Sequence, residues 1–132
     1  MASNVARLLA VGALAAPLAL GACGRSNPAS GDLLIDPIQV ESVDVLVQES
    51  DPPQASAHVR GVIGDGCSSL HSVAQERSGT TVVLTILRQR PANAMCIQIA
   101  RLYDETLRLE GTFPPGRYLL LVNGVETSFT TE

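Results

Sequence analysis

Apolar and polar residues alternate along most of this chain after residue 37, and this alternation limits the fold more than any other feature. Val43, Val45 and Val47 fall on one parity. A period of two is that of a β-strand, because successive side chains point to opposite faces. Apolar Ile38 and Val40 fall on the other parity. The pattern therefore predicts a strand from residue 39 onward with a bulge near residues 41–42.

Turn residues divide the rest of the chain into further short segments of this kind. Gly64-Asp65-Gly66, Ser78-Gly79 and Asn123-Gly124 are turn signals. No segment after residue 37 keeps a helical period, and residues 102–109, the nearest candidate, fit a strand better. The strands expected are residues 39–48, 54–63, 67–77, 80–89, 95–102, 105–110, 116–122 and 125–131. Short strands with turns between them predict an all-β sandwich or barrel, with Greek-key connections.

The N-terminal segment has the layout of an export signal. One basic residue, Arg7, precedes an apolar run over residues 8–20. This run is shorter than the ~20 residues that a membrane-spanning helix needs. The run closes with Leu20, Gly21, Ala22 and Cys23. A buried helix or a membrane span is the alternative interpretation.

The end of that run resembles the lipobox of bacterial lipoproteins, in which a Leu and two small residues precede a cysteine. The resemblance implies a lipoprotein signal peptide over residues 1–22, cleavage before Cys23 and attachment of lipid to the Cys23 thiol. An ordinary signal peptide, cut by the general peptidase, is the alternative. The small polar residues that follow predict a flexible tether over residues 23–36.

The two other cysteines, Cys67 and Cys96, predict a disulfide. A pair of cysteines in an exported domain is more often bridged than free. Zinc binding is not expected, because no histidines lie at ligand spacing from them. Two buried thiols are the alternative.

Four segments resemble an immunoglobulin-like domain of bacterial lipoproteins and secreted proteins. They are Gly61-Val-Ile-Gly-Asp-Gly-Cys67, Arg90-Pro-Ala-Asn-Ala-Met-Cys96, and Phe113-Pro-Pro-Gly-Arg-Tyr118 with Val122-Asn-Gly-Val125. The resemblance covers residues 38–131 and implies an immunoglobulin-like (fibronectin III-like) antiparallel β-sandwich of about seven or eight strands over residues 37–132. It also supports the Cys67–Cys96 bridge and implies that the Tyr118 hydroxyl bonds back to the backbone. It transfers no catalytic residue.

Charge and aromatic content argue against nucleic-acid and sugar binding. The residues after Cys23 include all thirteen acidic residues and eight arginines, for a formal charge of about −5, and the chain has no lysine. Nucleic-acid binding calls for a basic stripe. Stacking on bases or sugars calls for aromatic rings, and the chain has only two Tyr, two Phe and no Trp.

The sequence predicts neither a catalytic site nor a metal site. A Ser-His-Asp interpretation would use Asp65, Ser68, Ser69 and His71. On a strand, Ser69 and His71 would lie about 7 Å apart on one face, too far for a direct hydrogen bond. His58 lies on the polar parity of its strand, and Asp104-Glu105 lacks a calcium-binding loop. We therefore expect no enzymatic activity, no metal and no cofactor; a small hydrolase is the distant alternative.

One strand predicts an apolar outer face. Tyr118, Leu120 and Val122 share one parity, which leaves Leu119 and Leu121 on the other. If the first set is core, Leu119 and Leu121 face outward, where a sandwich normally carries polar residues. They are a candidate interaction face for a partner or a second copy, unless other parts of the chain cover them.

Together these features predict a lipid-anchored protein of the bacterial cell envelope, held at the outer face of the cytoplasmic membrane or at the outer membrane. Its non-catalytic domain would bind a protein or an envelope component. A structural or accessory lipoprotein with no specific ligand is the first alternative.

Overall fold

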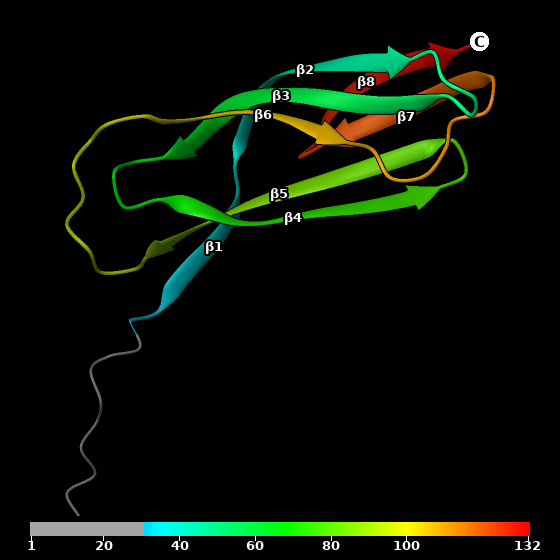
Figure 1. Ribbon diagram of the computed structural model, residues 1–132. Coiled ribbons are helices and arrows are strands. Elements are labelled where there is room, and N and C mark those ends of the chain that lie inside the picture. Colours follow the sequence, from blue (N-terminus) through cyan, green and yellow to red (C-terminus); the bar gives the residue numbers. More distant parts are fainter. Residues whose placement is uncertain (1–30) are drawn as a thin grey trace, which may run out of the picture.

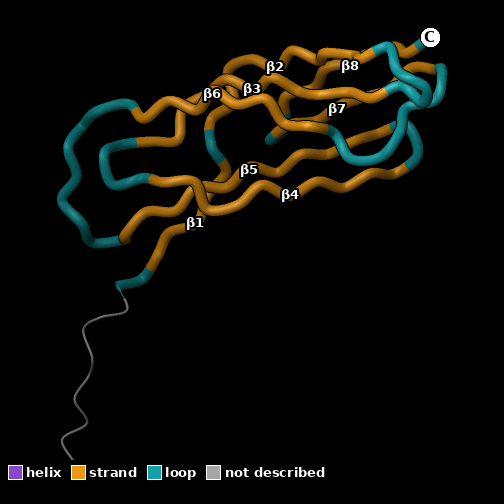
Figure 2. Tube along the Cα trace, in the orientation of Figure 1, coloured by secondary structure: helices purple, strands orange, loops and turns teal. Residues whose placement is uncertain are grey.

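The computed structural model describes residues 31–132. The predicted signal peptide over residues 1–22, including the cleavage residues, and the lipidation site Cys23 lie outside the described residues. The described part forms eight strands in two facing sheets (Figure 1), and the tube view shows loops joining them at both ends (Figure 2). The predicted all-β sandwich is confirmed. Among the described residues, no helix is long and apolar enough to span a membrane.

The strands pair into one sheet of three and one of five. In chain order they are β1 (Leu33–Pro37), β2 (Gln39–Gln48), β3 (Gln54–Gly64), β4 (Ser69–Ser78), β5 (Thr81–Pro91), β6 (Arg101–Arg108), β7 (Gly116–Val122) and β8 (Val125–Thr131). The smaller sheet has the order β2-β3-β6, and the larger has β1-β5-β7-β8 with β4 also paired to β5. Because β4 pairs along nearly all of β5, β1 and β7 share the opposite edge of β5.

One strand pair departs from the expected antiparallel arrangement. Residues 81–84 of β5 run parallel to residues 119–122 of β7, whereas the other described pairs are antiparallel. Parallel neighbours need a crossover connection. Here the chain makes it by leaving β5, adding β6 to the facing sheet and returning as β7 (Figure 1).

The domain starts earlier than predicted. The tether was expected to extend to residue 36 and the domain to begin at residue 37, but Leu33 already pairs with Pro91 in the β1–β5 ladder. The domain boundary is corrected to Leu33, because the first residues of β1 occupy the part of the β5 edge that β7 leaves open.

Two predicted strands are also replaced by one. Residues 95–102 and 105–110 were expected as separate strands, but β6 spans Arg101–Arg108 and residues 92–100 form a loop. The predicted bulge in β2 is confirmed, since the register with β3 shifts between Val40 and Ser42.

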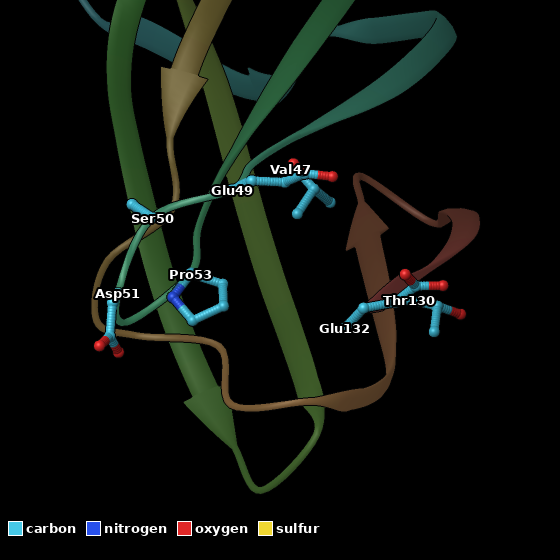
Figure 3. Close-up of a pocket in the computed structure, with 7 residues that line it drawn as sticks. All are labelled: Val47, Glu49, Ser50, Asp51, Pro53, Thr130 and Glu132. Carbon is cyan, nitrogen blue, oxygen red and sulfur yellow. The ribbon is translucent and has the colours of Figure 1, made fainter.

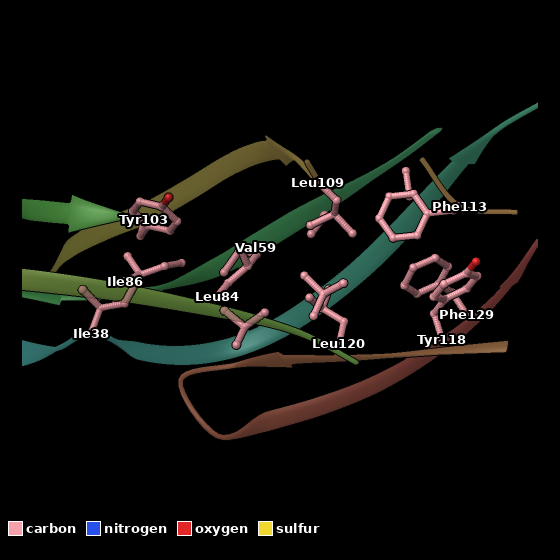
Figure 4. Packing of buried hydrophobic residues seen from close by; sticks show 14 residues of the cluster. Ile38, Val59, Leu84, Ile86, Tyr103, Leu109, Phe113, Tyr118, Leu120 and Phe129 are labelled. Carbon is pink, nitrogen blue, oxygen red and sulfur yellow. The ribbon is translucent and has the colours of Figure 1, made fainter. Parts of the chain in front are cut away.

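The core lies between the sheets (Figure 4). Its buried side chains come from both sheets, from the β6–β7 connection and from the junction of β1 and β2: Ile38, Ala55, Ala57, Val59, Val82, Leu84, Ile86, Tyr103, Leu109, Phe113, Tyr118, Leu120, Val122 and Phe129. The alternate residues of β7 and β5 point into it, so the parity predicted for Tyr118, Leu120 and Val122 is confirmed.

An aromatic cluster closes the core near the start of β7. The rings of Phe113, Tyr118 and Phe129 lie 5.1 to 5.5 Å apart between centroids. The Arg77 guanidinium lies 4.5 Å from the centroid of the Phe113 ring, a cation–π distance. The Tyr118 hydroxyl donates a hydrogen bond of 2.6 Å to the Pro114 carbonyl oxygen, the backbone contact that the sequence implied.

We expect Tyr118→Phe to lower the free energy of unfolding by about 1 kcal/mol, because it removes this hydrogen bond and leaves the Pro114 carbonyl oxygen with one donor fewer. Urea unfolding followed by circular dichroism measures the change. Tyr103→Phe is the matched control. Tyr103 is equally buried, but its hydroxyl makes no hydrogen bond within the described residues. Equal losses in the two variants would contradict the assignment.

Asn123 joins three parts of the fold at the point where β7 ends. Its side-chain Nδ2 donates to the carbonyl oxygens of Ile38 and Ile86 at 3.0 and 2.9 Å, and its Oδ1 accepts from Ile86 N at 2.9 Å. Ile86 lies between the segments of β5 that pair with β7 and with β1. The amide thus takes the place of a neighbouring strand there. Asn123 also has a φ of 47°, the left-handed conformation that the Asn-Gly turn requires.

Candidate functional site

The most distinctive surface of the domain lies where β1 begins, at the end opposite the C-terminus (Figure 1). Two loops meet there: residues 65–68, between β3 and β4, and residues 92–100, between β5 and β6. We call these two loops the bridged tip.

The disulfide predicted between Cys67 and Cys96 is present and joins the two loops, with Cα atoms 5.5 Å apart. Next to it, Gly66 N donates to the Ile97 carbonyl oxygen at 3.0 Å. A Cβ on Gly66 would lie 2.6 Å from Ile97 Cγ1, so the loops can approach this closely only because residue 66 has no side chain. The long loop is therefore held against the short one by a covalent bond, a backbone hydrogen bond and close packing.

Asp65 organises the short loop. Its Oδ1 accepts hydrogen bonds from Cys67 N at 3.1 Å and from Ser68 Oγ at 3.0 Å, and its Oδ2 lies 3.3 Å from Arg90 Nη2. Desolvation by itself would raise the pKa of Asp65, but these donors and the Arg90 charge outweigh it and hold the pKa below its usual 3.8. Because the folded state favours the carboxylate, this contribution to stability is present above the unfolded pKa and is lost as pH falls through the folded one.

Arginines close the core beneath the tip. Arg88 and Arg90 continue the inward parity of Val82, Leu84 and Ile86 on β5. Arg88 Nη1 donates to the Ile63 carbonyl oxygen at 2.9 Å, and Arg101 Nη1 donates to the Ser68 carbonyl oxygen at 3.0 Å. The guanidinium groups thus bind backbone oxygens and fix the loops in place.

Apolar side chains project from the tip into solvent. Met95 is 101% exposed, Ile97 70% and Ile99 54%, and Leu102 at the foot of the loop is 71% exposed. On β1, Leu33, Leu34 and Ile35 are also about half exposed. Within the described residues most of the strongly exposed large apolar side chains therefore gather at this end.

The outer face predicted from β7 is less exposed. Leu119 and Leu121 point away from the core but are half-buried. Their neighbours on β5 and β8 flank them, with Leu119 between Thr81 and Ser128. The tip carries the stronger apolar exposure, and the exposure of Met95, Ile97 and Ile99 was not predicted from the sequence. A signal was available: residues 91–100 contain no charged residue, and Met95, Ile97 and Ile99 alternate, which we interpreted as a strand.

The residues of the Ser-His-Asp interpretation do not come together as that chemistry requires. Asp65 bonds to Ser68, whereas His71 Nδ1 lies 2.8 Å from Gln89 Oε1 on the neighbouring strand. His58 pairs with Asp104 at 2.6 Å on the other sheet. Neither imidazole therefore contacts a serine among these groups, and the serine that Asp65 binds has no histidine beside it.

The side chains at the tip are also poorly suited to bind a metal ion. The sulfurs of Cys67 and Cys96 lie near the Asp65 carboxylate, but they are bonded to each other and the carboxylate is paired with Arg90. A disulfide lacks the thiolate that binds metal.

A groove of about 760 Å³ lies at the other end of the sandwich, between the β2–β3 connection and the end of β8. It is lined by Val47, Glu49, Ser50, Asp51, Pro53, Thr130 and Glu132. Figure 3 shows Asp51 and Glu132 on opposite sides of an open depression, so its carboxyl groups do not converge on one point.

Comparison with known proteins identifies the fold family but not the activity. Residues 57–131 match the family described as the ORF11 beta-sandwich domain. A protein of Herpetosiphon aurantiacus named "Uncharacterized 10.2 kDa protein in HgiCIIM 5'region" is 38% identical over 88 residues, which are 67% of this chain and 94% of that protein. Two proteins of the same organism, named for the HgiBIM and HgiEIM 5' regions, are each 34% identical over 76 residues, which are 58% of this chain and 93% of each protein. No solved structure matches. The family match spans more than half of the chain and includes both bridged cysteines, so the chain belongs to the ORF11 beta-sandwich domain family.

Proposed function

We propose that this protein is a bacterial lipoprotein, anchored to a membrane of the cell envelope through lipid on Cys23, with a non-catalytic β-sandwich that binds a protein or another envelope component. The observation that carries the proposal is the sequence Leu20-Gly21-Ala22-Cys23 at the end of an apolar run. A Leu, two small residues and a cysteine in this order are what a lipoprotein peptidase and the lipid-transfer step require.

The disulfide supports export. Bridges such as Cys67–Cys96 persist in oxidising compartments outside the cytoplasm and are rare inside it. The bridge also assigns a separate role to these two cysteines, which leaves Cys23 as the one available for lipid.

The site geometry supports a binding role over a catalytic one. Asp65, the most strongly engaged carboxylate at the tip, binds backbone and hydroxyl donors and an arginine rather than an imidazole. The apolar side chains lie outside the core, where contact with a partner would remove them from water.

The anchor is tested by expressing the full chain in bacteria that process lipoproteins. We expect the protein to sediment with membranes and to incorporate radiolabelled palmitate. Cys23→Ala should release nearly all of it into the soluble fraction, because the acyl chains provide the stable membrane attachment. Ser26→Ala, a neighbouring substitution of similar size, is the matched control and should stay in the membrane. A Cys23→Ala protein that remains membrane-bound would contradict the anchor.

The binding role is separated from the structural alternative by cross-linking the anchored protein in intact cells. A discrete cross-linked species that mass spectrometry identifies in repeated preparations supports binding. Its absence favours an accessory envelope lipoprotein with no specific ligand.

A further inference from the structure

We propose that the bridged tip is a lipid-contacting surface, which lays Met95, Ile97 and Ile99 into the interface of the bilayer that holds the anchor. This inference rests on the proposed lipidation of Cys23 and adds to it an orientation of the domain.

The tip presents its apolar side chains in a fixed way. The loop that carries them is bonded to the short loop at Cys96 through the disulfide and at the Ile97 carbonyl oxygen through Gly66 N. The Met95 side chain on this scaffold is completely exposed. A loop held by these contacts keeps its apolar groups in solvent, and contact with another apolar phase would take them out of water.

The place where the chain enters the domain indicates that the apolar phase in contact with the tip is the bilayer. Ala92 N donates a hydrogen bond of 2.8 Å to the Asp32 carbonyl oxygen, so the start of the described chain lies directly beside the start of the long loop. Seven residues lie between Cys23 and Gly31, so eight Cα–Cα steps join the two. At no more than ~3.6 Å per step they span about 29 Å at most. A lipid on Cys23 therefore holds this end of the sandwich close to the membrane.

The distribution of charge fits the same orientation. Residues 91–100 carry no charged side chain, and the exposed Arg101 follows them at the foot of the loop. The Arg101 guanidinium uses Nη1 to bind the Ser68 carbonyl oxygen, which leaves its other N–H groups for phosphate while the apolar residues lie deeper. The opposite end of the domain carries Glu49, Asp51 and Glu132 around the groove of Figure 3. At the tip end the carboxylates of Asp36 and Asp65 are paired with Arg88 and Arg90, and Asp32 is exposed.

The chain contains no tryptophan, so a single introduced one reports on its own surroundings. We would place it at Met95→Trp, where the exposed side chain can be enlarged without disturbing the core. The matched control is Leu46→Trp, at an exposed position near the far end of β2. The lipid-anchored full chain is reconstituted into phosphatidylcholine vesicles whose acyl chains carry bromine, a contact quencher, and vesicle flotation is measured on the same samples.

We expect both variants to float with the vesicles. The Met95→Trp emission should shift to shorter wavelength and lose most of its intensity to brominated lipid, whereas the Leu46→Trp emission should be nearly unchanged. If both variants float and neither is quenched, the anchor stands and the tip inference is overturned. If neither variant floats, the proposed anchor fails and the inference falls with it.

Two further occupants of the tip are distinguished by placing Met95→Trp in the Cys23→Ala protein, which carries no lipid, in buffer without lipid or detergent. Shielding of this tryptophan from acrylamide that rises with protein concentration would identify a second copy of the chain. Concentration-independent shielding in that buffer would identify residues of the chain itself. Either result would overturn lipid contact as the role of the tip.

Discussion

Replacing both Cys67 and Cys96 by alanine is expected to lower the free energy of unfolding by about 3.6 kcal/mol. The bridge spans 29 residues of sequence. In the chain-entropy model, a loop of that length loses about 12 cal/mol/K when it is closed in the unfolded chain, which corresponds to this free energy at 25 °C. Since domains of this size are typically stable by only 5–15 kcal/mol, the loss is a large share of the total.

The measurement is urea unfolding of the protein in a Cys23→Ala background, which leaves the sandwich unchanged and removes the lipid. Reduction of the bridged protein with dithiothreitol should reproduce the loss, and the same reductant should leave the doubly substituted protein unaffected. A change smaller than about 1 kcal/mol would mean that the bridge constrains the unfolded chain far less than loop closure predicts.

Asn123→Ala is expected to cost about 3 kcal/mol, because two backbone groups, the Ile86 N–H and the Ile38 carbonyl oxygen, lose the side-chain partner that binds them. The Ile86 carbonyl oxygen loses one of its two donors and keeps Ile38 N at 3.0 Å. Alanine also adopts the left-handed conformation at this position less readily than asparagine.

Asn123→Gly separates the two causes. Glycine keeps the turn conformation and loses only the side-chain amide, so we expect it to be destabilised less than alanine but still by about 2 kcal/mol. Asn93→Ala, the same substitution at an exposed loop position, is the control and should change stability little. A full recovery of stability in Asn123→Gly would show that the turn, and not the bridging amide, sets the cost.

Much of the fold could be predicted from residue patterns, because apolar and polar residues alternate along the strands that face the core. Ala55, Ala57 and Val59 are buried on the core face of β3, and their alternation marked the strand correctly. The bulge in β2 was visible for the same reason, since a bulge shifts the parity of the apolar residues.

Prediction of strands from alternating apolar residues was wrong at positions 95–99, where the alternation lies in a loop. Met95, Ile97 and Ile99 alternate in a loop, with side chains exposed to solvent rather than packed on a sheet. β1 was missed because its residues Leu33 to Ile35 are three apolar residues in a row and all are exposed. Whether such a segment pairs depends on a free strand edge, and here that edge is residues 87–91 of β5, which β7 does not reach because it pairs with residues 81–84.

The tip could not be located from the sequence for a related reason. Cys67 and Cys96 predicted a bridge, but the position of that bridge at the end of the sandwich beside β1 depends on the contact between Asp32 and Ala92. That contact joins residues 60 positions apart and leaves no local pattern.

The placement of β1 also determines how force enters the domain. A pull on the chain ahead of Gly31 reaches the sandwich through β1, whose ladder to β5 runs from Leu33 opposite Pro91 to Pro37 opposite Leu87. When the pull is directed along the strand, the ladder is loaded in shear, so its hydrogen bonds share the tension instead of opening one at a time. The load then passes into β5, which is bonded on both edges. A domain held in this way transmits tension from its attachment point straight to its central strand.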